Sequence, residues 1–309
     1  MAACEKFSFS STAGPILDAR LWRPEGQPRA VVQLIHGMAE HIDRYQPLSQ
    51  ALNKAGIAVV GHNQLGHGQK APRKGYFADK NGWQCLIDDV HRLRGVAQEQ
   101  FPGAPYFMLG HSMGSFVLRC YLEEHAGGLC GAMLSGTGHF DAKLIQAGLS
   151  AARCVCLLGG KRKPSALLNH LVFSANNKPF APARTAFDWF SRADEAVDPY
   201  IADPLCGFVF TGGAYRDFFR GLQRLTDEQA RKRIPAELPL RLFSGDHDPV
   251  GDMGQGVELV AQELREAGLQ HVETRLYPDG RHEMLNEVNR DEVFRDVIIF
   301  VEQHLPGKV

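Results

Sequence analysis

The interpretation of this chain starts from one stretch, Tyr106-Phe-Met-Leu-Gly-His-Ser-Met-Gly114. Its first four residues are aromatic or apolar, as expected of a buried strand, and apolar residues at helical spacing follow at Phe116, Val117, Leu118, Tyr121 and Leu122. Glycines two positions before and after Ser112 permit a turn tight enough to hold this serine at strained backbone angles. The strand, turn and helix together predict a nucleophile elbow, whereas the five turn residues alone would fit an ordinary glycine-rich loop equally well.

The overall composition excludes several classes of protein. The 309 residues carry a formal net charge of −1, so there is no basic excess for binding nucleic acid. Uncharged stretches are too short for a membrane span, and residues 1–8 lack the apolar run of a secretory signal peptide. The seven cysteines are scattered, without the spacing of a disulfide framework, which favours the reduced cytoplasm as the location.

The pattern along the chain predicts an α/β fold. Apolar runs indicate strands at residues 6–11, 16–22, 30–35, 57–60, 106–109, 129–135, 240–243 and 272–277. Amphipathic stretches indicate helices at about residues 44–54, 81–101, 113–122, 257–264 and 293–301. The first two strands are expected to form a hairpin. The alternation of strands and helices that follows favours a mostly parallel sheet with helices on both faces.

The alternation stops between about residues 139 and 239, where the pattern is helical, irregular and rich in proline. We therefore expect an inserted cap at residues 139–239 and a core formed by residues 1–138 and 240–309. The cap holds a group of aromatic residues, Phe187, Trp189, Phe190, Phe208, Phe210, Phe218 and Phe219. Most should form the core of the cap, and a minority should face an apolar acyl pocket. The candidates for substrate binding are Trp189, Phe190, Phe208 and His111, although a structural role is the stronger expectation for His111.

Three residue types that make up a catalytic triad fall at the ends of predicted strands. Ser112 follows the strand at 106–109, Asp248 follows that at 240–243, and His282 follows that at 272–277. The carboxyl ends of parallel strands meet at one edge of a sheet, so these side chains should converge there. A serine hydroxyl needs a base, and the base needs an orienting carboxylate. Asp246 competes with Asp248 for the carboxylate role, and we favour Asp248.

Acyl transfer also requires hydrogen-bond donors for the negative charge that develops on the carbonyl oxygen. One donor is expected to be the backbone N–H of Met113, directly after the serine. The loop after the strand at 30–35 should supply the other, the N–H of Met38, and Gly37 would let this loop approach the site. A plain turn at the end of the strand is the alternative for His36 and Gly37.

Several histidines near these loops raise the question of a metal. They are His36, His41, His62 and His67, with Asp43 close by in the sequence. Their spacing does not match a tight ligand set on a helix, and polar residues in glycine-rich loops commonly bind their own backbone. We therefore expect no metal and no cofactor.

Five motifs together resemble the monoacylglycerol lipase and lysophospholipase branch of the α/β hydrolases, also described as serine aminopeptidase-like. They are His36-Gly-Met-Ala-Glu-His-Ile-Asp-Arg-Tyr45, Gly66-His-Gly68, Gly110-His-Ser-Met-Gly114, Gly245-Asp-His-Asp-Pro249 and Arg281-His-Glu283. The resemblance covers about residues 5–304. It implies that Ser112, Asp248 and His282 are catalytic and that Met38 and Met113 are oxyanion donors. The chain departs from the family pattern around Asn63, where the family more often has an aspartate.

The sequence thus predicts a serine hydrolase that cleaves carboxylic esters, such as acylglycerols or lysophospholipids, through an acyl-enzyme. The alternatives are an aminopeptidase or amidase on the same fold, and a lipid-binding protein without catalysis. Leu157 and Leu158 beside Lys161-Arg-Lys163 raise the further hypothesis of transient contact between the cap and a membrane surface. A solvated run of charges is the alternative for that segment. The sequence does not indicate the oligomeric state.

Overall fold

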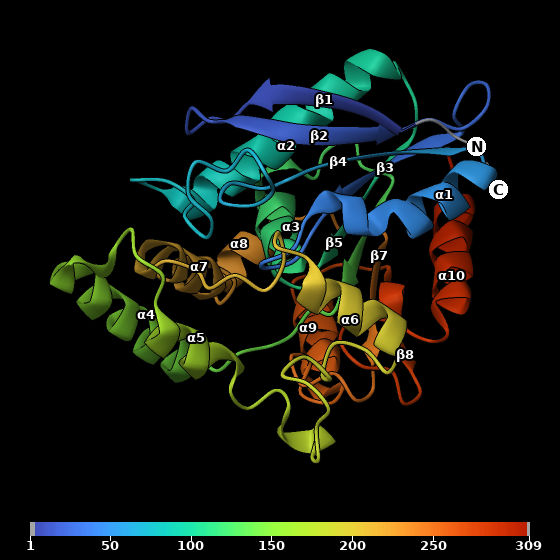
Figure 1. Ribbon diagram of the computed structural model, residues 1–309. Helices are drawn as coiled ribbons and strands as arrows, with labels where there is room; N and C mark the ends of the chain where they lie inside the picture. The colour runs from blue at the N-terminus through green and yellow to red at the C-terminus, as the bar shows by residue number, and fades with distance from the viewer. Residues whose placement is uncertain (1–3, 308–309) are drawn as a thin grey trace.

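An eight-stranded sheet forms the centre of the protein in the computed structural model, which describes residues 4–307 (Figure 1). The strand order is β1-β2-β4-β3-β5-β6-β7-β8. The strands are β1 (Cys4–Ser10), β2 (Ile16–Trp22), β3 (Ala30–Ile35), β4 (Ile57–His62), β5 (Tyr106–His111), β6 (Gly131–Ser135), β7 (Leu240–Gly245) and β8 (Val272–Tyr277). The β1–β2 hairpin is antiparallel and β2 pairs antiparallel with β4, whereas all pairs from β4 to β8 are parallel. The predicted α/β fold is therefore confirmed.

Both faces of the sheet are covered by helices. One face packs against α1 (Gln46–Lys54) and α10 (Arg290–Gln303), and the other against α2 (Gly82–Gln100), α3 (Met113–His125) and α9 (Gln255–Glu266). Strand β3 shows why, because its side chains are buried alternately on the two faces: Val31 and Ile35 lie in one apolar cluster, and Val32 and Leu34 in the other. An apolar strand of this kind is stable only when both faces of the sheet are shielded from water.

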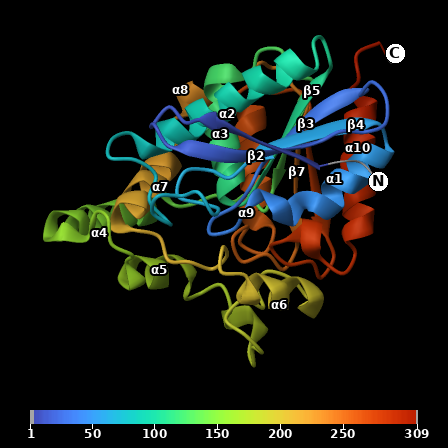
Figure 2. The same cartoon turned by 45° about the horizontal axis from the view of Figure 1, so that its top comes forward.

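The segment between β6 and β7 contains α4 (Ala142–Val155), α5 (Ala166–Phe173), α6 (Asp194–Ala202), α7 (Gly212–Arg224) and α8 (Glu228–Arg231). Helix α7 packs on α2 and α3: the rings of Phe218 and Trp83 lie 6.0 Å apart, and Arg224 pairs with Glu123 at 2.9 Å. In turn, α4 packs on α7. Helices α4, α5 and α6 form a separate layer beneath the sheet in both views (Figures 1 and 2).

Several boundaries differ from those predicted. Strands β4 and β7 each run two residues longer, through Gly61-His62 and Ser244-Gly245, because pairing with β2 and β8 continues past the apolar run. A short 3-10 helix, η1 (Ile42–Tyr45), precedes α1. Residues 1–3, part of the stretch from which a signal peptide was argued to be absent, lie outside the described residues.

One helical segment, Ala142–Gly160, has the length and mean hydropathy of a membrane span by composition alone. It contains α4 and the π-helical segment η2 (Cys156–Gly160), and the chain kinks at Leu158 and Gly159. Only 22% of its most apolar window is buried. The buried part includes Ile145, Leu149 and Ala152. The other apolar side chains of this segment are therefore at least partly exposed at the protein surface.

Candidate active site

Ser112 occupies the turn between β5 and α3 with a backbone φ of 52° and ψ of −122°. A positive φ is unfavourable for a residue with a side chain, and the neighbouring glycines make the turn possible. A Cβ atom on Gly114 would collide with the carbonyl oxygen of Ile35, and one on Gly110 would collide with the carbonyl oxygen of Gly114. The Ser112 N–H donates to the carbonyl oxygen of Ser135 at 2.8 Å. The turn therefore has the geometry of a nucleophile elbow.

His282 and Asp248 meet beyond the carboxyl ends of β8 and β7. Nδ1 of His282 lies 3.0 Å from both Oδ1 and Oδ2 of Asp248. The Asp248 carboxylate is fully buried and accepts two further hydrogen bonds, from the Ser244 hydroxyl at 2.6 Å and from the Val250 N–H at 2.8 Å. Of the two carboxylates that the sequence left open, Asp248 is the one that contacts the histidine.

Burial and charge act against each other in this pair. Burial lowers the pKa of His282, but the Asp248 carboxylate outweighs burial, so the pKa is raised above the ordinary 6.5. Burial would raise the pKa of Asp248, but His282 and the hydrogen bonds to the carboxylate hold it below its ordinary value. An imidazole whose Nδ1 is held by an ionised carboxylate leaves Nε2 free to take a proton, as a general base must.

His111 packs against the ring of His282, with 4.9 Å between the ring centroids. Its Nδ1 atom pairs with the Ser135 hydroxyl at 3.2 Å. Burial and the neighbouring His282 lower the pKa of His111 to about 4, so its ring is neutral at physiological pH. His111 therefore makes the structural contact expected of it, and it also lines the cavity at Ser112.

The loop after β3 comes close to the serine. A Cβ atom on Gly37 would lie only 3.2 Å from the Cβ of Ser112. The Gly37 N–H donates to Oε1 of Glu40 at 2.5 Å, which fixes the peptide between His36 and Gly37. Within residues 4–307, the backbone N–H groups of Met38 and Met113 have no acceptor in the protein. Free, preorganised donors are what an oxyanion hole requires, and the assignment of these two to it stays a prediction.

Two of the loop histidines hold the backbone around this site. Nε2 of His36 accepts the Gln64 N–H at 3.0 Å, and Nε2 of His67 accepts the Ala39 N–H at 3.2 Å. The Nδ1 atom of each ring pairs with a backbone carbonyl oxygen. Burial lowers the pKa of both histidines to about 3, so both remain neutral. Their ring nitrogens are thus occupied by the fold.

Asn63, where the chain departs from the family pattern, has a defined contact. Its Oδ1 atom accepts the N–H of Ile42 at 2.9 Å, at the start of η1. This contact requires only an acceptor oxygen, which an amide supplies as well as a carboxylate does.

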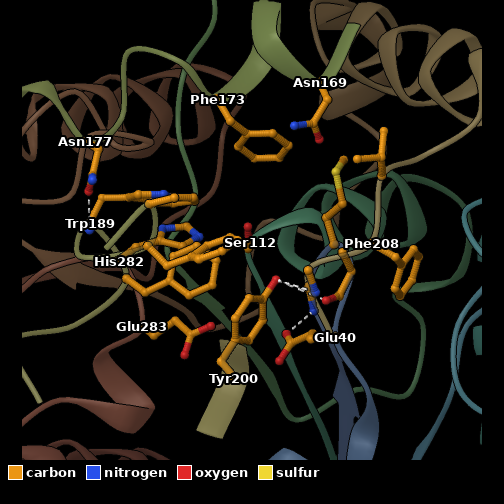
Figure 3. A pocket seen from close by; sticks show the side chains of 18 of the residues that line it. Glu40, Ser112, Asn169, Phe173, Asn177, Trp189, Tyr200, Phe208, His282 and Glu283 are labelled. Carbon is orange, nitrogen blue, oxygen red and sulfur yellow. Dashed lines mark hydrogen bonds between the residues drawn. The ribbon is translucent and has the colours of Figure 1, made fainter. Parts of the chain in front are cut away.

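A cavity of about 500 Å³ opens beside Ser112 and His282 (Figure 3). Much of its wall is aromatic or apolar. Trp189, Phe190 and Phe208, three of the predicted substrate-binding residues, line this cavity, and so does Phe187. Phe210, Phe218 and Phe219 lie instead in the main apolar core, so the expectation that only a minority of the seven aromatic residues would face the pocket is wrong. The wall also includes residues that the sequence did not single out: Phe173 and Asn169 on α5, and Tyr200 on α6.

A buried ion-pair group forms another part of this wall. Arg44 donates to Oε2 of Glu40 at 2.5 Å and to both carboxylate oxygens of Glu283 at 2.9 and 2.6 Å. The ring of Tyr200 packs on the guanidinium, 4.8 Å from its centroid. In the sequence, Glu40, Arg44 and Glu283 stood out only as members of the family motifs. The (i, i+4) spacing of Glu40 and Arg44 could have indicated this ion pair, but nothing in the pattern joined Glu283 to it.

The cap side of the cavity is hydrogen-bonded to the histidine loop. The His282 N–H donates to the carbonyl oxygen of Trp189 at 3.3 Å, and the Glu283 N–H donates to that of Phe190 at 2.7 Å. The rings of Trp189 and His282 lie 5.1 Å apart. The apolar wall and the histidine therefore hold each other in place.

Comparison with known proteins places the chain among hydrolases. The profile of the family described as serine aminopeptidase, S33, matches residues 26–289. A monoacylglycerol lipase from Mycolicibacterium smegmatis is 29% identical over 302 residues, with 96% of this chain and 97% of the relative covered. The human monoglyceride lipase is 28% identical over 294 residues, with 94% and 88% covered.

Solved structures agree with these relatives. A thermostable carboxyl esterase from Bacillus coagulans, crystallised with glycerol, superposes with a TM-score of 0.92 at 30% identity, covering 99% of this chain and 100% of the esterase. A lipase in an open form gives a TM-score of 0.89 at 27% identity, covering 98% and 100%. The sheet order, the elbow and these matches lead to one assignment: the chain belongs to the serine aminopeptidase S33 family of α/β hydrolases, in its monoacylglycerol lipase-like branch.

Proposed function

We propose that this protein is a serine carboxylester hydrolase that cleaves acylglycerols, lysophospholipids or similar acyl esters. The observation that carries the proposal is the arrangement at one end of the cavity. Ser112, at a strained positive φ, shares that cavity with His282, whose Nδ1 is held by a buried Asp248 at 3.0 Å. The esterase and lipase relatives support the same reaction class.

In the proposed mechanism, Ser112 attacks the ester carbonyl while Nε2 of His282 takes the hydroxyl proton. Asp248 keeps the imidazole in the required tautomer and stabilises its charged form. The N–H groups of Met38 and Met113 stabilise the oxyanion. His282 then gives the proton to the departing alcohol, and an acyl-enzyme remains. Water, deprotonated by the same histidine, releases the carboxylic acid and restores the serine. The reaction requires no cofactor.

The lining of the cavity favours an acyl substrate. Phe173, Phe187, Trp189, Phe190 and Phe208 give it the apolar wall that an acyl chain requires. The cavity, at about 500 Å³, is large enough for a ligand of lipid or drug size.

The carboxylates of the cavity disfavour the aminopeptidase alternative. Recognition of a substrate ammonium group would need a carboxylate free to accept its hydrogen bonds. Both oxygens of Glu283 already accept from Arg44, and Glu40 accepts from Arg44, Tyr45 and Gly37. These acids are therefore compensated within the fold, and we assign them to the support of the loops around Ser112.

We further propose that the cap contacts lipid surfaces from which the substrate is drawn. Five large apolar side chains of the segment are more than half exposed: Leu144 70%, Leu157 86%, Leu158 89%, Leu167 61% and Leu171 56%. Helix α5 connects this surface to the cavity, because Ala166, Asn169 and Phe173 line the cavity while Leu167 and Leu171 point to solvent. An amphiphilic ester would pass from the exposed leucines to Ser112 along one helix.

The basic run beside these leucines contributes less to this proposal. Lys161 and Arg162 pair with Asp79 at 3.3 and 2.7 Å, so they are partly neutralised within the protein. The apolar contacts, rather than these charges, should therefore carry the interaction with lipid.

The division into a core (residues 1–138 and 240–309) and a cap (139–239), like the cytoplasmic location, stays a proposal.

The test of the function is a series of p-nitrophenyl esters of increasing acyl length, with the Ser112→Ala variant as the control. We expect turnover that depends on Ser112, and the optimum chain length distinguishes a short-chain esterase from a lipase with a long pocket. Absence of turnover at every length would contradict the proposal. Hydrolysis of amino-acid p-nitroanilides without hydrolysis of esters would favour the aminopeptidase instead.

A further inference from the structure

A cluster of three potential metal ligands lies outside the catalytic residues, where the turn after α6 meets the loop after β3. It consists of His41, Asp203 and Cys206, and their ligand atoms all lie within 4.8 Å of one another. Nε2 of His41 is 2.9 Å from Oδ2 of Asp203. His41 and Cys206 are far apart in the sequence, so no motif spacing joins them. These three residues come together only in the folded protein.

The thiol in this cluster has no part in the proposed mechanism, and Cys206 packs in an apolar cluster with Trp189, Phe190, Val197 and Tyr200. Cys206 is only 9% exposed, and within residues 4–307 its Sγ atom has no hydrogen-bond partner. The backbone makes the turn rigid, because the Cys206 N–H donates to the carbonyl oxygen of Asp203 at 3.0 Å and Oδ1 of Asp203 accepts the Leu205 N–H at 2.7 Å. The thiol and the carboxylate are thus presented to the same histidine.

The surroundings of His41 suit a metal ligand. A ligating histidine usually offers its second ring nitrogen to a carboxylate. Nδ1 of His41 is buried without a hydrogen-bond partner and lies 3.9 Å from Oδ2 of Asp43, which is itself held by Arg20. When the metal takes Nε2, the ring proton moves to Nδ1 and faces this carboxylate.

The carboxylate of Asp203 gives the cluster a negative charge of its own, and the guanidinium of Arg44 is already paired with Glu40 and Glu283. Asp203 retains 32% exposure of its side chain, which gives an ion access from solvent.

We propose that His41, Asp203 and Cys206 form a zinc-binding site that links the cap to the loop carrying Met38. Imidazole nitrogen, carboxylate oxygen and thiolate sulfur are all ligands that Zn²⁺ binds, and water would complete a tetrahedron. Zn²⁺ binds the thiolate form of cysteine, so binding replaces S–H by S–Zn and releases one proton to solvent.

The consequence concerns the wall of the cavity. Gly207 and Phe208, directly after the cysteine, line the cavity, and the Gly207 N–H donates to the carbonyl oxygen of Ala39 at 2.9 Å. A bound ion would add a second link across this same contact. The site would thereby fix the cap turn against the oxyanion loop.

The test uses Co²⁺ as a spectroscopic probe and Zn²⁺ as its competitor on the full-length protein. We expect a thiolate-to-cobalt charge-transfer band in the wild type, its loss on addition of one equivalent of Zn²⁺, and release of one proton per ion in unbuffered titration. Cys206→Ser should abolish the band, and Asp203→Asn should weaken Zn²⁺ binding at least about tenfold. The matched control is Cys154→Ser, an exposed cysteine elsewhere in the segment, which should leave all three readouts unchanged.

None of these readouts requires turnover, so the outcome is independent of the proposed esterase activity. Absence of the charge-transfer band in the wild type would overturn the proposal. A band that persists in Cys206→Ser, or that disappears in Cys154→Ser, would also overturn it, since the ligand would then be another cysteine.

Discussion

Nδ1 of His282 lies 3.0 Å from both carboxylate oxygens of Asp248, although the two residues come from different loops, after β8 and after β7. The carboxylate is fully buried and is held by Ser244 and Val250 as well. A buried negative charge stabilised in this way fixes both the orientation of the imidazole and its protonation. The first predictions concern this pair.

Asp248→Asn should reduce kcat by about 10⁴-fold, because an amide can hold the imidazole in the wrong tautomer while leaving the geometry intact. The measurement is kcat on a p-nitrophenyl ester, with circular dichroism to confirm folding. Asp246→Asn is the matched control from the same loop and should stay near wild-type activity. Equal losses in both variants would contradict the assignment of Asp248.

The pH dependence of kcat/KM should reflect the raised pKa of His282. A general base must be neutral, so activity should rise with pH through the pKa of His282 in the folded protein, with a midpoint above 6.5. In Asp248→Asn the charge that raises this pKa is lost and burial remains, so the midpoint should move to lower pH while the plateau falls. An acid limb that stays in place would exclude His282 as the titrating group.

Phe173→Ala should impair long-chain substrates selectively. The side chain projects from α5 into the cavity (Figure 3), and removing it takes away apolar contact with an acyl chain. We expect kcat/KM to fall roughly tenfold for long-chain esters and to stay close to wild type for acetate esters. Leu259→Ala, at an exposed leucine on α9 outside the cap, is the control. A uniform loss at all chain lengths would show that Phe173 supports the fold rather than the acyl site.

Arg44→Met should destabilise the protein by about 3–5 kcal/mol, because it leaves the buried carboxylates of Glu40 and Glu283 without their partner. Urea unfolding followed by fluorescence measures this loss. Arg184→Met, at an exposed arginine that pairs with Asp194 and Asp198, should cost less than about 1 kcal/mol. Similar costs in the two variants would contradict the structural role given to Arg44.

Lipid contact through the cap should depend on its exposed leucines. A Leu157→Ser, Leu158→Ser double variant should bind vesicles of zwitterionic lipid more weakly in co-sedimentation and keep its activity on dissolved short-chain esters. Ile16→Ser with Val288→Ser removes two apolar residues that are 57% and 58% exposed outside the cap, and this variant should bind as the wild type does. Absence of vesicle binding by the wild type would contradict the proposed contact between the cap and lipid.

The sequence predicted the fold because the central strands are buried on both faces, and such strands appear as continuous apolar runs. Ala30–Ile35 was bounded correctly for this reason, while β4 was cut short at Val60 because glycine and histidine interrupt its apolar run. Ile16–Trp22 and Val272–Tyr277 were also bounded correctly, although both strands are partly exposed. The positions of Ser112, Asp248 and His282 followed from the rule that sites assemble at the carboxyl ends of parallel strands.

Features that depend on the packing of the cap could not be predicted. Phe173 and Tyr200 reach the cavity only because α5 and α6 lie across the loops that follow the carboxyl ends of the strands, and no periodicity in the sequence determines that arrangement. The same limit applies to pairs formed between distant loops. Arg44 meets Glu283, and His41 meets Asp203, through tertiary contacts that local spacing does not encode.

The most direct test of the central claim is intact-mass analysis after reaction with a fluorophosphonate, which traps an activated serine. We predict one adduct per chain, located on Ser112 by peptide mapping, and no adduct in Ser112→Ala or after denaturation. Labelling of a different residue, or no labelling of the folded wild type, would contradict the claim that Ser112 is the nucleophile.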